Sequence, residues 1–128
     1  MYETFSKQMA MEADSLYSIA NTMILPVSLD YKSKLSQNLE KDMPSHVNLL
    51  QNYNEKLVKL IDSIEALNKA RKLARLYNEH EHHEQAAFYR NQVADAMKIT
   101  RSACDDLEEV IDDRLWPLPK YSEMLLLK

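Results

Sequence analysis

Histidine and glutamate side chains crowd together in the second half of the chain, where they could bind a metal ion. The cluster reads His80-Glu81-His82-His83-Glu84. On a helix, His80 and Glu84, or Glu79 and His82, would share a face, and Glu-x-x-His is the spacing of di-iron carboxylate bundles. Such a site needs a second Glu-x-x-His and two further inward glutamates, whereas the only other histidine is His46. The pattern favours a polar, solvated loop over a metal site.

An acidic stretch lies where we expect the third helix to end. Its members are Asp105, Asp106, Glu108, Glu109, Asp112 and Asp113. Acidic side chains near a helix C-terminus, and like charges four residues apart, destabilise a helix by tenths of a kcal/mol. We therefore expect a cationic neighbour, for which Lys32, Lys34 and Lys41 are candidates. A solvated face paired within the chain is favoured over a metal site or a basic partner.

A basic strip formed by Lys69, Arg71, Lys72 and Arg75 could contact phosphate or nucleic acid. Cations suit the C-terminal end of a helix, and no aromatic residues interleave with these four to stack on bases. We therefore favour a structural role for these four cations over contact with phosphate, and we expect no nucleic-acid partner.

Cys104 is the single cysteine of the chain, so neither an intrachain disulfide nor a CxxC pair can form. Its acidic neighbours would not activate a thiolate, which disfavours a catalytic cysteine. A reducing, cytoplasmic setting is expected. We find no Ser/His/Asp order, no pair of catalytic carboxylates and no nucleotide motif, so we assign no catalytic, cofactor-binding or metal-binding residue.

The elements that carry these side chains are expected to be helices, because the 128 residues include no glycine. About nine would be expected at average usage. Their absence excludes Gly-rich phosphate loops and disfavours all-β and Rossmann-type folds. A net charge of −4 also disfavours a dedicated nucleic-acid binder. No apolar run approaches the ~18 residues of a membrane span, so no membrane partner is expected.

Apolar spacing predicts three long helices, at about 3–41, 45–77 and 81–114, in one domain spanning 1–128. The first is expected to kink at Pro26, and Ser45 to cap the second. Asn78 is expected to take a left-handed conformation at the second reversal. The second helix carries a stripe through Leu50, Tyr53, Leu57, Leu60, Ile64 and Leu67, widened by Val58, Ile61 and Leu73. The fold class is therefore all-α, an up-down-up antiparallel three-helix bundle with a short C-terminal tail or helix.

The tail, residues 115–128, contains the only tryptophan and four consecutive apolar residues, Met124 to Leu127. These need cover, either on the bundle's own end, which is favoured, or on another domain or subunit. The candidate docking or packing residues are Trp116, Pro117, Leu118, Pro119, Tyr121, Met124 and Leu125.

Several stretches resemble the C-terminal helical region of type III glutamine synthetases. They are Tyr89-Arg90 through Met97, Leu107-Glu108, Leu115-Trp116-Pro117-Leu118-Pro119-x-Tyr121-x-Glu123-Met124-Leu125, and Ile24-Leu25-Pro26 followed by Tyr31. Residues Leu49 to Leu76 carry no family information, and Asp95 stands where the family pattern leads us to expect proline.

The resemblance implies that the chain is a fragment of a larger ligase that makes glutamine from glutamate, ammonia and ATP with magnesium or manganese. The family's catalytic residues belong to an upstream domain, and none corresponds to a position here. The implied partners are that catalytic domain and the other subunits of a ring-shaped homo-oligomer. The alternative is a free-standing helical adaptor or dimerisation module, which should bury Trp116 in its own core.

Overall fold

The computed structural model describes residues 2–38, 43–111 and 114–117, and all regular structure within these ranges is helical. The elements are α1 (Tyr2–Ile19), η1 (Ala20–Ile24), α2 (Leu25–Asn38), α3 (Pro44–Ala74), α4 (His82–Phe88), η2 (Tyr89–Val93) and α5 (Ala94–Glu108), where η marks a π-helical turn. The predicted all-α class is confirmed for the described part of the chain. No helix found there is long and apolar enough to cross a membrane.

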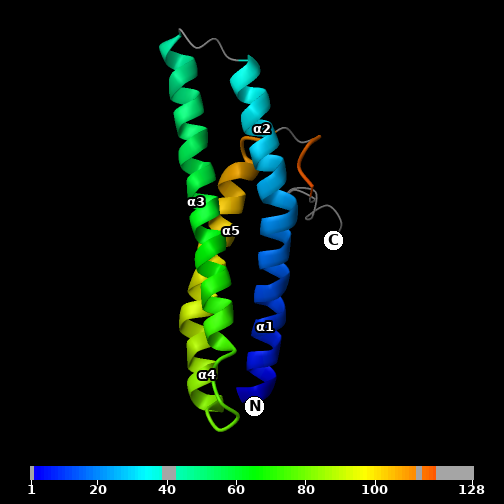
Figure 1. Ribbon diagram of the computed structural model, residues 1–128, viewed down its shortest axis with the longest axis vertical. Coiled ribbons are helices and arrows are strands. Elements are labelled where there is room, and N and C mark those ends of the chain that lie inside the picture. The colour runs from blue at the N-terminus through cyan, green and yellow to red at the C-terminus, as the bar shows by residue number, and fades with distance from the viewer. Residues whose placement is uncertain (1, 39–42, 112–113, 118–128) are drawn as a thin grey trace.

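The helices lie side by side as long rods (Figure 1). The elements α1, η1 and α2 follow one another without a break, and so do α4, η2 and α5. We call these two runs the first and the third rod, and α3, which lies between them in the sequence, the second. Helix α3 contacts α1, α2, η2 and α5. The turn between α3 and α4 lies at the same end as the N-terminus (Figure 1).

The chain passes Pro26 in a helical conformation, directly after the π-helical turn η1. Within this turn the N–H of Leu25 donates to the carbonyl of Ala20, five residues back. Proline removes one donor from the helical ladder, and a widened turn is one way for a helix to accommodate that loss. Ser28 Oγ donates to the carbonyl of Ile24 at 2.7 Å nearby. The structure thus places a π turn at this point, and the kink at Pro26 stays a prediction.

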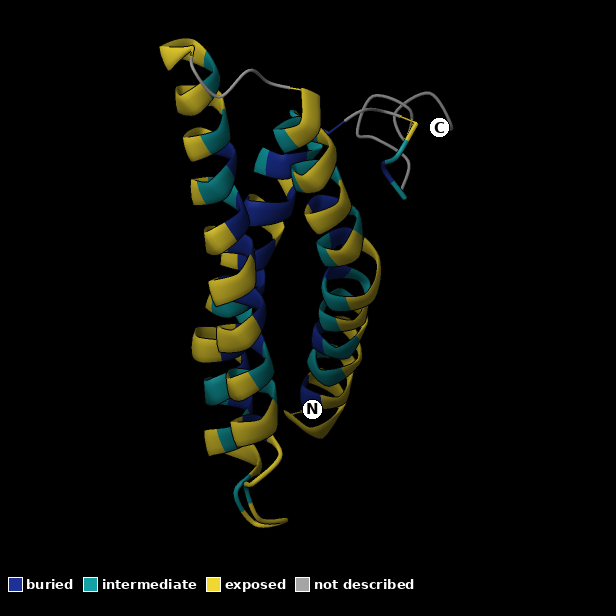
Figure 2. Ribbon diagram, turned by 45° about the horizontal axis from the view of Figure 1, so that its top comes forward, coloured by how far each residue is buried: buried dark blue, intermediate teal, exposed yellow. Residues whose placement is uncertain are grey.

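Two apolar clusters hold the helices together. The buried residues lie on the sides of the helices that face one another (Figure 2). The first cluster comprises Ala20, Ile24, Tyr53, Leu57, Leu60, Ile64, Ala103, Cys104, Leu107, Ile111 and Trp116. The second cluster comprises Ala13, Leu67, Ala74, Tyr89, Val93 and Met97. Each draws residues from all three rods, so burial of apolar surface in both clusters fixes how the rods sit against one another.

The apolar stripe of α3 is narrower than the sequence predicts. Tyr53, Leu57, Leu60, Ile64 and Leu67 are buried as expected. The flanking residues, however, are largely exposed: Val58, Ile61 and Leu73. These three positions do not widen the buried part of the stripe. Helix α3 nevertheless contacts helices on two sides, α1 and α2 on one and α5 on the other.

Two predicted end signals differ from the structure. Helix α3 begins at Pro44, with Met43 as its N-cap and no side-chain cap, so Ser45 is not the cap. Proline suits the first helical position because its missing N–H would find no partner there. Asn78 does not adopt a left-handed conformation, since no described non-glycine residue has a positive φ. Instead its backbone N–H donates to the Glu81 carboxylate at 2.9 Å.

The third rod ends earlier than predicted, because α5 stops at Glu108 and the following residues form a turn. In that turn the N–H of Val110 donates to Leu107 and that of Ile111 to the same carbonyl, at 3.0 and 2.9 Å. Three acidic side chains fall in the last turn region, where the helix dipole disfavours them. Residues 112–113, in the predicted helix, lie outside the described residues.

Candidate docking segment and interhelical contacts

Trp116 packs onto this chain's own bundle. The side chain is 8% exposed and belongs to the first cluster, where the partly buried Leu115 also lies. Its indole Nε1 is buried and has no hydrogen-bond partner among the residues that the structure describes. The choice between the two alternatives for the tail as a whole stays a prediction. Pro117 is partly buried beside it.

The other candidate docking residues cannot be placed alongside Trp116. Leu118, Pro119, Tyr121, Met124 and Leu125 all lie outside the described residues. Their assignment to a docking segment stays a prediction.

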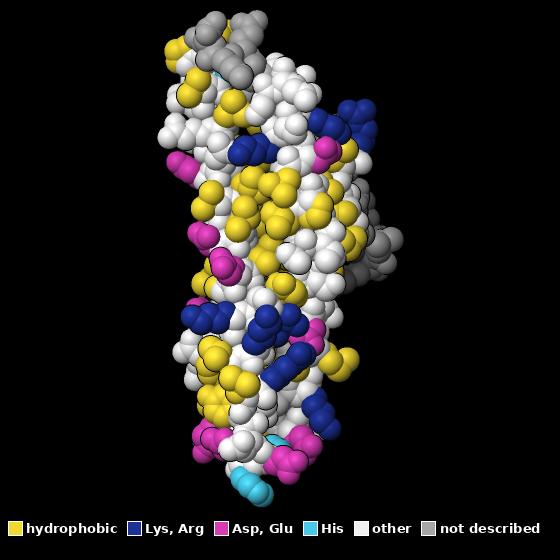
Figure 3. Space-filling model, viewed as in Figure 1, with side chains coloured by type: hydrophobic (Ala, Val, Ile, Leu, Met, Phe, Trp, Pro, Cys, Tyr) yellow, Lys and Arg dark blue, Asp and Glu magenta, His cyan; other side chains and the backbone are white. Residues whose placement is uncertain are grey.

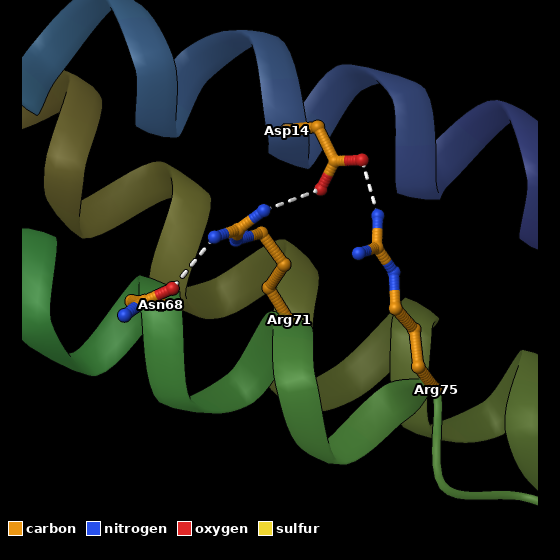
Figure 4. A network of polar contacts seen from close by, with 4 residues as sticks. All are labelled: Asp14, Asn68, Arg71 and Arg75. Carbon is orange, nitrogen blue, oxygen red and sulfur yellow. Dashed lines mark hydrogen bonds and ion pairs between the residues drawn. The ribbon is translucent and has the colours of Figure 1, made fainter. Parts of the chain in front are cut away.

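Two arginines of the basic strip bind an acidic residue of α1 (Figure 4). Arg71 Nη1 lies 3.0 Å from Asp14 Oδ1, and Arg75 Nη2 pairs with Asp14 Oδ2. Arg71 also donates to Asn68 Oδ1 at 2.7 Å, and its guanidinium lies 4.2 Å from the centroid of the Tyr17 ring. The Arg71 side chain is only 17% exposed. These two arginines therefore join the C-terminal end of α3 to α1, a contact that the sequence did not predict.

Asp14 is the residue of this network that the sequence did not single out. It stands 57 residues from Arg71, and only the packing of α1 on α3 brings them together. A lone aspartate on the edge of an apolar stripe gives no sequence signal of such a partner.

Replacing Asp14 by asparagine is expected to lower the free energy of unfolding by about 1–2 kcal/mol, because Arg71 would keep its buried position without a countercharge. Asp30→Asn is the control, since Asp30 pairs at 3.3 Å with exposed Lys34 one turn away on the same helix. In Asp30→Asn the free energy of unfolding should fall by less than about 0.5 kcal/mol. Urea unfolding measures both. Equal losses in the two variants would show that the Asp14 network adds nothing beyond a surface ion pair.

One residue of the acidic stretch, Asp106, finds its cation on α3. Lys59 Nζ lies 3.0 Å from Asp106 Oδ2 and 3.5 Å from Ser102 Oγ. Of the lysines expected there, Lys34 pairs with Asp30, and Lys41 lies outside the described residues. The expectation of a cation from the first helix was wrong for Asp106, because α5 packs chiefly on α3.

The histidine cluster spans the end of the turn before α4, at His80 and Glu81, and the first residues of α4, which begins at His82. His80, His82 and His83 are exposed, and the His83 ring meets the ring of Tyr2 edge-on at 5.1 Å. Within residues 2–38, 43–111 and 114–117, no three His, Cys, Asp or Glu side chains converge to hold a metal ion. The cluster is thus divided between the turn and the first turn of α4, and the absence of a metal site stays a prediction.

Burial decides the chemistry of two groups in the first cluster. It raises the pKa of the Cys104 thiol to about 12, with a smaller contribution from the Asp105 charge. Burial likewise raises the pKa of Tyr53 to about 12, against the opposing effect of its hydrogen bond to Ser28. The Tyr53 hydroxyl donates to the Ser28 carbonyl at 2.7 Å. A thiol that stays protonated at neutral pH is a poor nucleophile, which fits a packing role for Cys104.

The free energy of unfolding is expected to fall as the pH rises above about 9, because the unfolded chain releases the Cys104 and Tyr53 protons first. Below that pH both states keep these protons and neither group contributes a pH dependence. The loss for each group should be on the order of 1 kcal/mol per pH unit between its two pKa values.

Urea unfolding at about pH 8 and about pH 10.5 measures this loss. The double variant Cys104→Ala, Tyr53→Phe should show a clearly smaller alkaline loss than the parent chain. An unchanged loss would assign it to other groups.

Comparison with known proteins places the chain within a longer sequence. No protein-family model matches it. A type-3 glutamine synthetase of Dictyostelium discoideum is 29% identical over 150 aligned positions, which cover 100% of this chain and 19% of that protein. A glutamine synthetase of Bacteroides fragilis (strain YCH46) is 29% identical over 139 positions, covering 98% of this chain and 19% of that protein.

The chain thus spans about a fifth of the length of these curated relatives. The tail and the Ile24-Leu25-Pro26 step, which carry the resemblance in the sequence, lie within the matched length. The resemblance is confirmed: over essentially its full length, the chain is similar to a segment of type-3 glutamine synthetases.

Proposed function

We propose that this chain is the C-terminal helical segment of a type III glutamine synthetase and serves as a packing element of that enzyme. The observation that carries the proposal is the match of the entire chain to only 19% of a type-3 glutamine synthetase. A segment of this kind would pack on the catalytic domain or between subunits of a ring-shaped homo-oligomer. In this proposal the rods form an up-down-up antiparallel bundle, kinked at Pro26.

The catalytic chemistry is assigned to the remainder of the polypeptide. That remainder would ligate ammonia to glutamate with ATP and magnesium or manganese, in the cytoplasm. Magnesium is held mainly by carboxylate oxygens and phosphates, and no three acidic or histidine side chains converge in the described part of this chain. We therefore place no step of the reaction on this segment.

The uses of its reactive side chains support a packing role. Arg71 and Arg75 pair with Asp14, and Lys59 pairs with Asp106, so these charges join helices to one another. Cys104 is buried with a raised pKa. None of these groups needs a substrate to account for its position.

Deleting the segment from the complete enzyme tests the proposal. We expect the truncated enzyme to lose its oligomeric assembly, measured by sedimentation, and with it most of its glutamine-forming activity. The isolated 128-residue chain, incubated with ATP, glutamate and ammonia, should form no glutamine. A truncated enzyme that keeps both assembly and activity, or turnover by the isolated chain, would contradict the proposal.

A free-standing helical adaptor or dimerisation module is the second candidate. The burial of Trp116 against this chain's own first cluster favours it, because an independent bundle must cover its own apolar residues. Under this alternative the source organism would make the chain as a separate small protein, and its oligomeric state would become the property to measure.

A further inference from the structure

One long stretch of the first rod carries no charge at all. Residues Ser15 to Leu29 include no Asp, Glu, Lys or Arg, although 28% of the whole chain is charged. At that frequency a stretch of fifteen residues would hold about four charges. It runs from the C-terminal part of α1 through η1 into α2.

Burial does not explain the missing charges, because much of this stretch faces outward. Its exposed residues, which we call the uncharged face, are Ser15, Ser18, Thr22, Met23, Pro26 and Leu29. Leu29 is 48% exposed. Met11, which lies one helical turn before the stretch begins at Ser15, is 70% exposed. The outward side of the rod is therefore made of small hydroxyl and apolar side chains.

The other two rods show the ordinary pattern. The outward side of α3 carries Glu55, Lys59, Asp62, Glu65 and Lys69, and that of α5 carries Asp95, Lys98, Arg101 and Asp105. Both place an exposed charge on nearly every turn. Depletion of charged residues marks the centre of a protein interface rather than a solvated surface.

A hollow lies next to this face, between the first rod and α3. It measures about 370 Å³. Its lining is Tyr17, Asn21 and Leu25 of the uncharged stretch and Ile61, Ile64, Glu65 and Asn68 of α3. Figure 3 shows hydrophobic side chains gathered in the upper middle of the visible side of the molecule, with basic side chains above and below them. The uncharged face thus borders a depression that a protruding apolar side chain can enter.

We propose that the uncharged face is the surface on which the remainder of the glutamine synthetase polypeptide packs. This rests on the proposed function. About four-fifths of each relative lies outside the matched segment and is joined to it covalently, so it is a permanent neighbour. Permanent interfaces are apolar, whereas surfaces that are exposed part of the time keep their charges. The occupant is an uncharged, apolar surface of that same polypeptide.

The experiment introduces one thiol on the uncharged face. Ser18→Cys is compared with the control Ala66→Cys, which lies on the exposed, charged side of α3. Cys104 is buried with a raised pKa and should react slowly with N-ethylmaleimide in both. The rate of labelling at each site is followed by peptide mass spectrometry, in the 128-residue chain and in the complete polypeptide.

We expect the Ser18→Cys thiol to react about tenfold or more slowly in the complete polypeptide than in the 128-residue chain. The Ala66→Cys thiol should react at the same rate in both. Equal rates for Ser18→Cys would overturn the proposal. Two other results would also overturn it. If the Ser18→Cys thiol in the 128-residue chain reacts slowly only at high protein concentration, the face is covered by a second copy of the chain. If it reacts slowly until residues 118–128 are removed, the face is covered by the tail.

Failure of this inference can be told apart from failure of the proposed function. If the complete polypeptide exists and Ser18→Cys reacts equally fast in it, only the docking surface is wrong. If no longer polypeptide contains this sequence, the proposed function itself is wrong.

Discussion

Replacing Trp116 by alanine is expected to lower the free energy of unfolding by about 3 kcal/mol. The side chain is 8% exposed and packs in the first cluster, so its removal leaves a cavity among residues of the other rods. Urea unfolding followed by circular dichroism measures the loss.

Trp116→Phe is the matched control for this prediction. It keeps an aromatic ring in the cluster and removes the unpartnered indole N–H, so its cost should stay below about 1.5 kcal/mol. A Trp116→Ala loss below about 1 kcal/mol would mean that the tail does not hold to the bundle.

Replacing Leu60 by alanine is expected to cost about 3 kcal/mol as well, within the usual 2–5 kcal/mol for a buried leucine. Leu60 is fully buried at the centre of α3. Two residues earlier on the same helix, Val58 is 54% exposed, and Val58→Ala should change the stability by less than about 0.5 kcal/mol.

The pair tests the burial pattern directly, because the sequence places both residues in the apolar stripe of α3. Thermal or urea unfolding of the two variants gives the comparison. Similar losses would mean that Val58 contributes to a packed surface, against the structure described above.

The helices and much of their buried seam follow from local features of the sequence. The absence of glycine removes most alternatives to helix, and the spacing from Tyr53 to Leu67 repeats in threes and fours. A repeat of this kind fixes which side of a helix is apolar whatever the partner is. The five residues of that seam are buried accordingly.

Features that depend on partners far along the chain do not follow from the sequence in this way. Spacing cannot say how wide the buried seam is, and Ile61 and Leu73, which widen the apolar stripe in the sequence, are exposed in the structure. It also gives no sign that Thr100 is fully buried and donates to the carbonyl of Ser63, 37 residues away.

The candidate site likewise contains residues that the sequence could identify and residues that it could not. Trp116 could be singled out as a packing residue because it is the only tryptophan and stands between Leu115 and Pro117. Its partners in the first cluster could not, because they come from all three rods. The Asp14 network likewise depends on how α1 meets α3.

The central claim is that this sequence works as part of a longer glutamine synthetase polypeptide. The mass of the polypeptide that contains it in the source organism, determined by immunoblotting with an antibody against this chain, tests that claim most directly. We predict a single polypeptide about five times as long as this chain, since the chain covers 19% of each relative. A polypeptide of 15.0 kDa, the mass of this chain alone, would contradict the claim and leave the free-standing bundle.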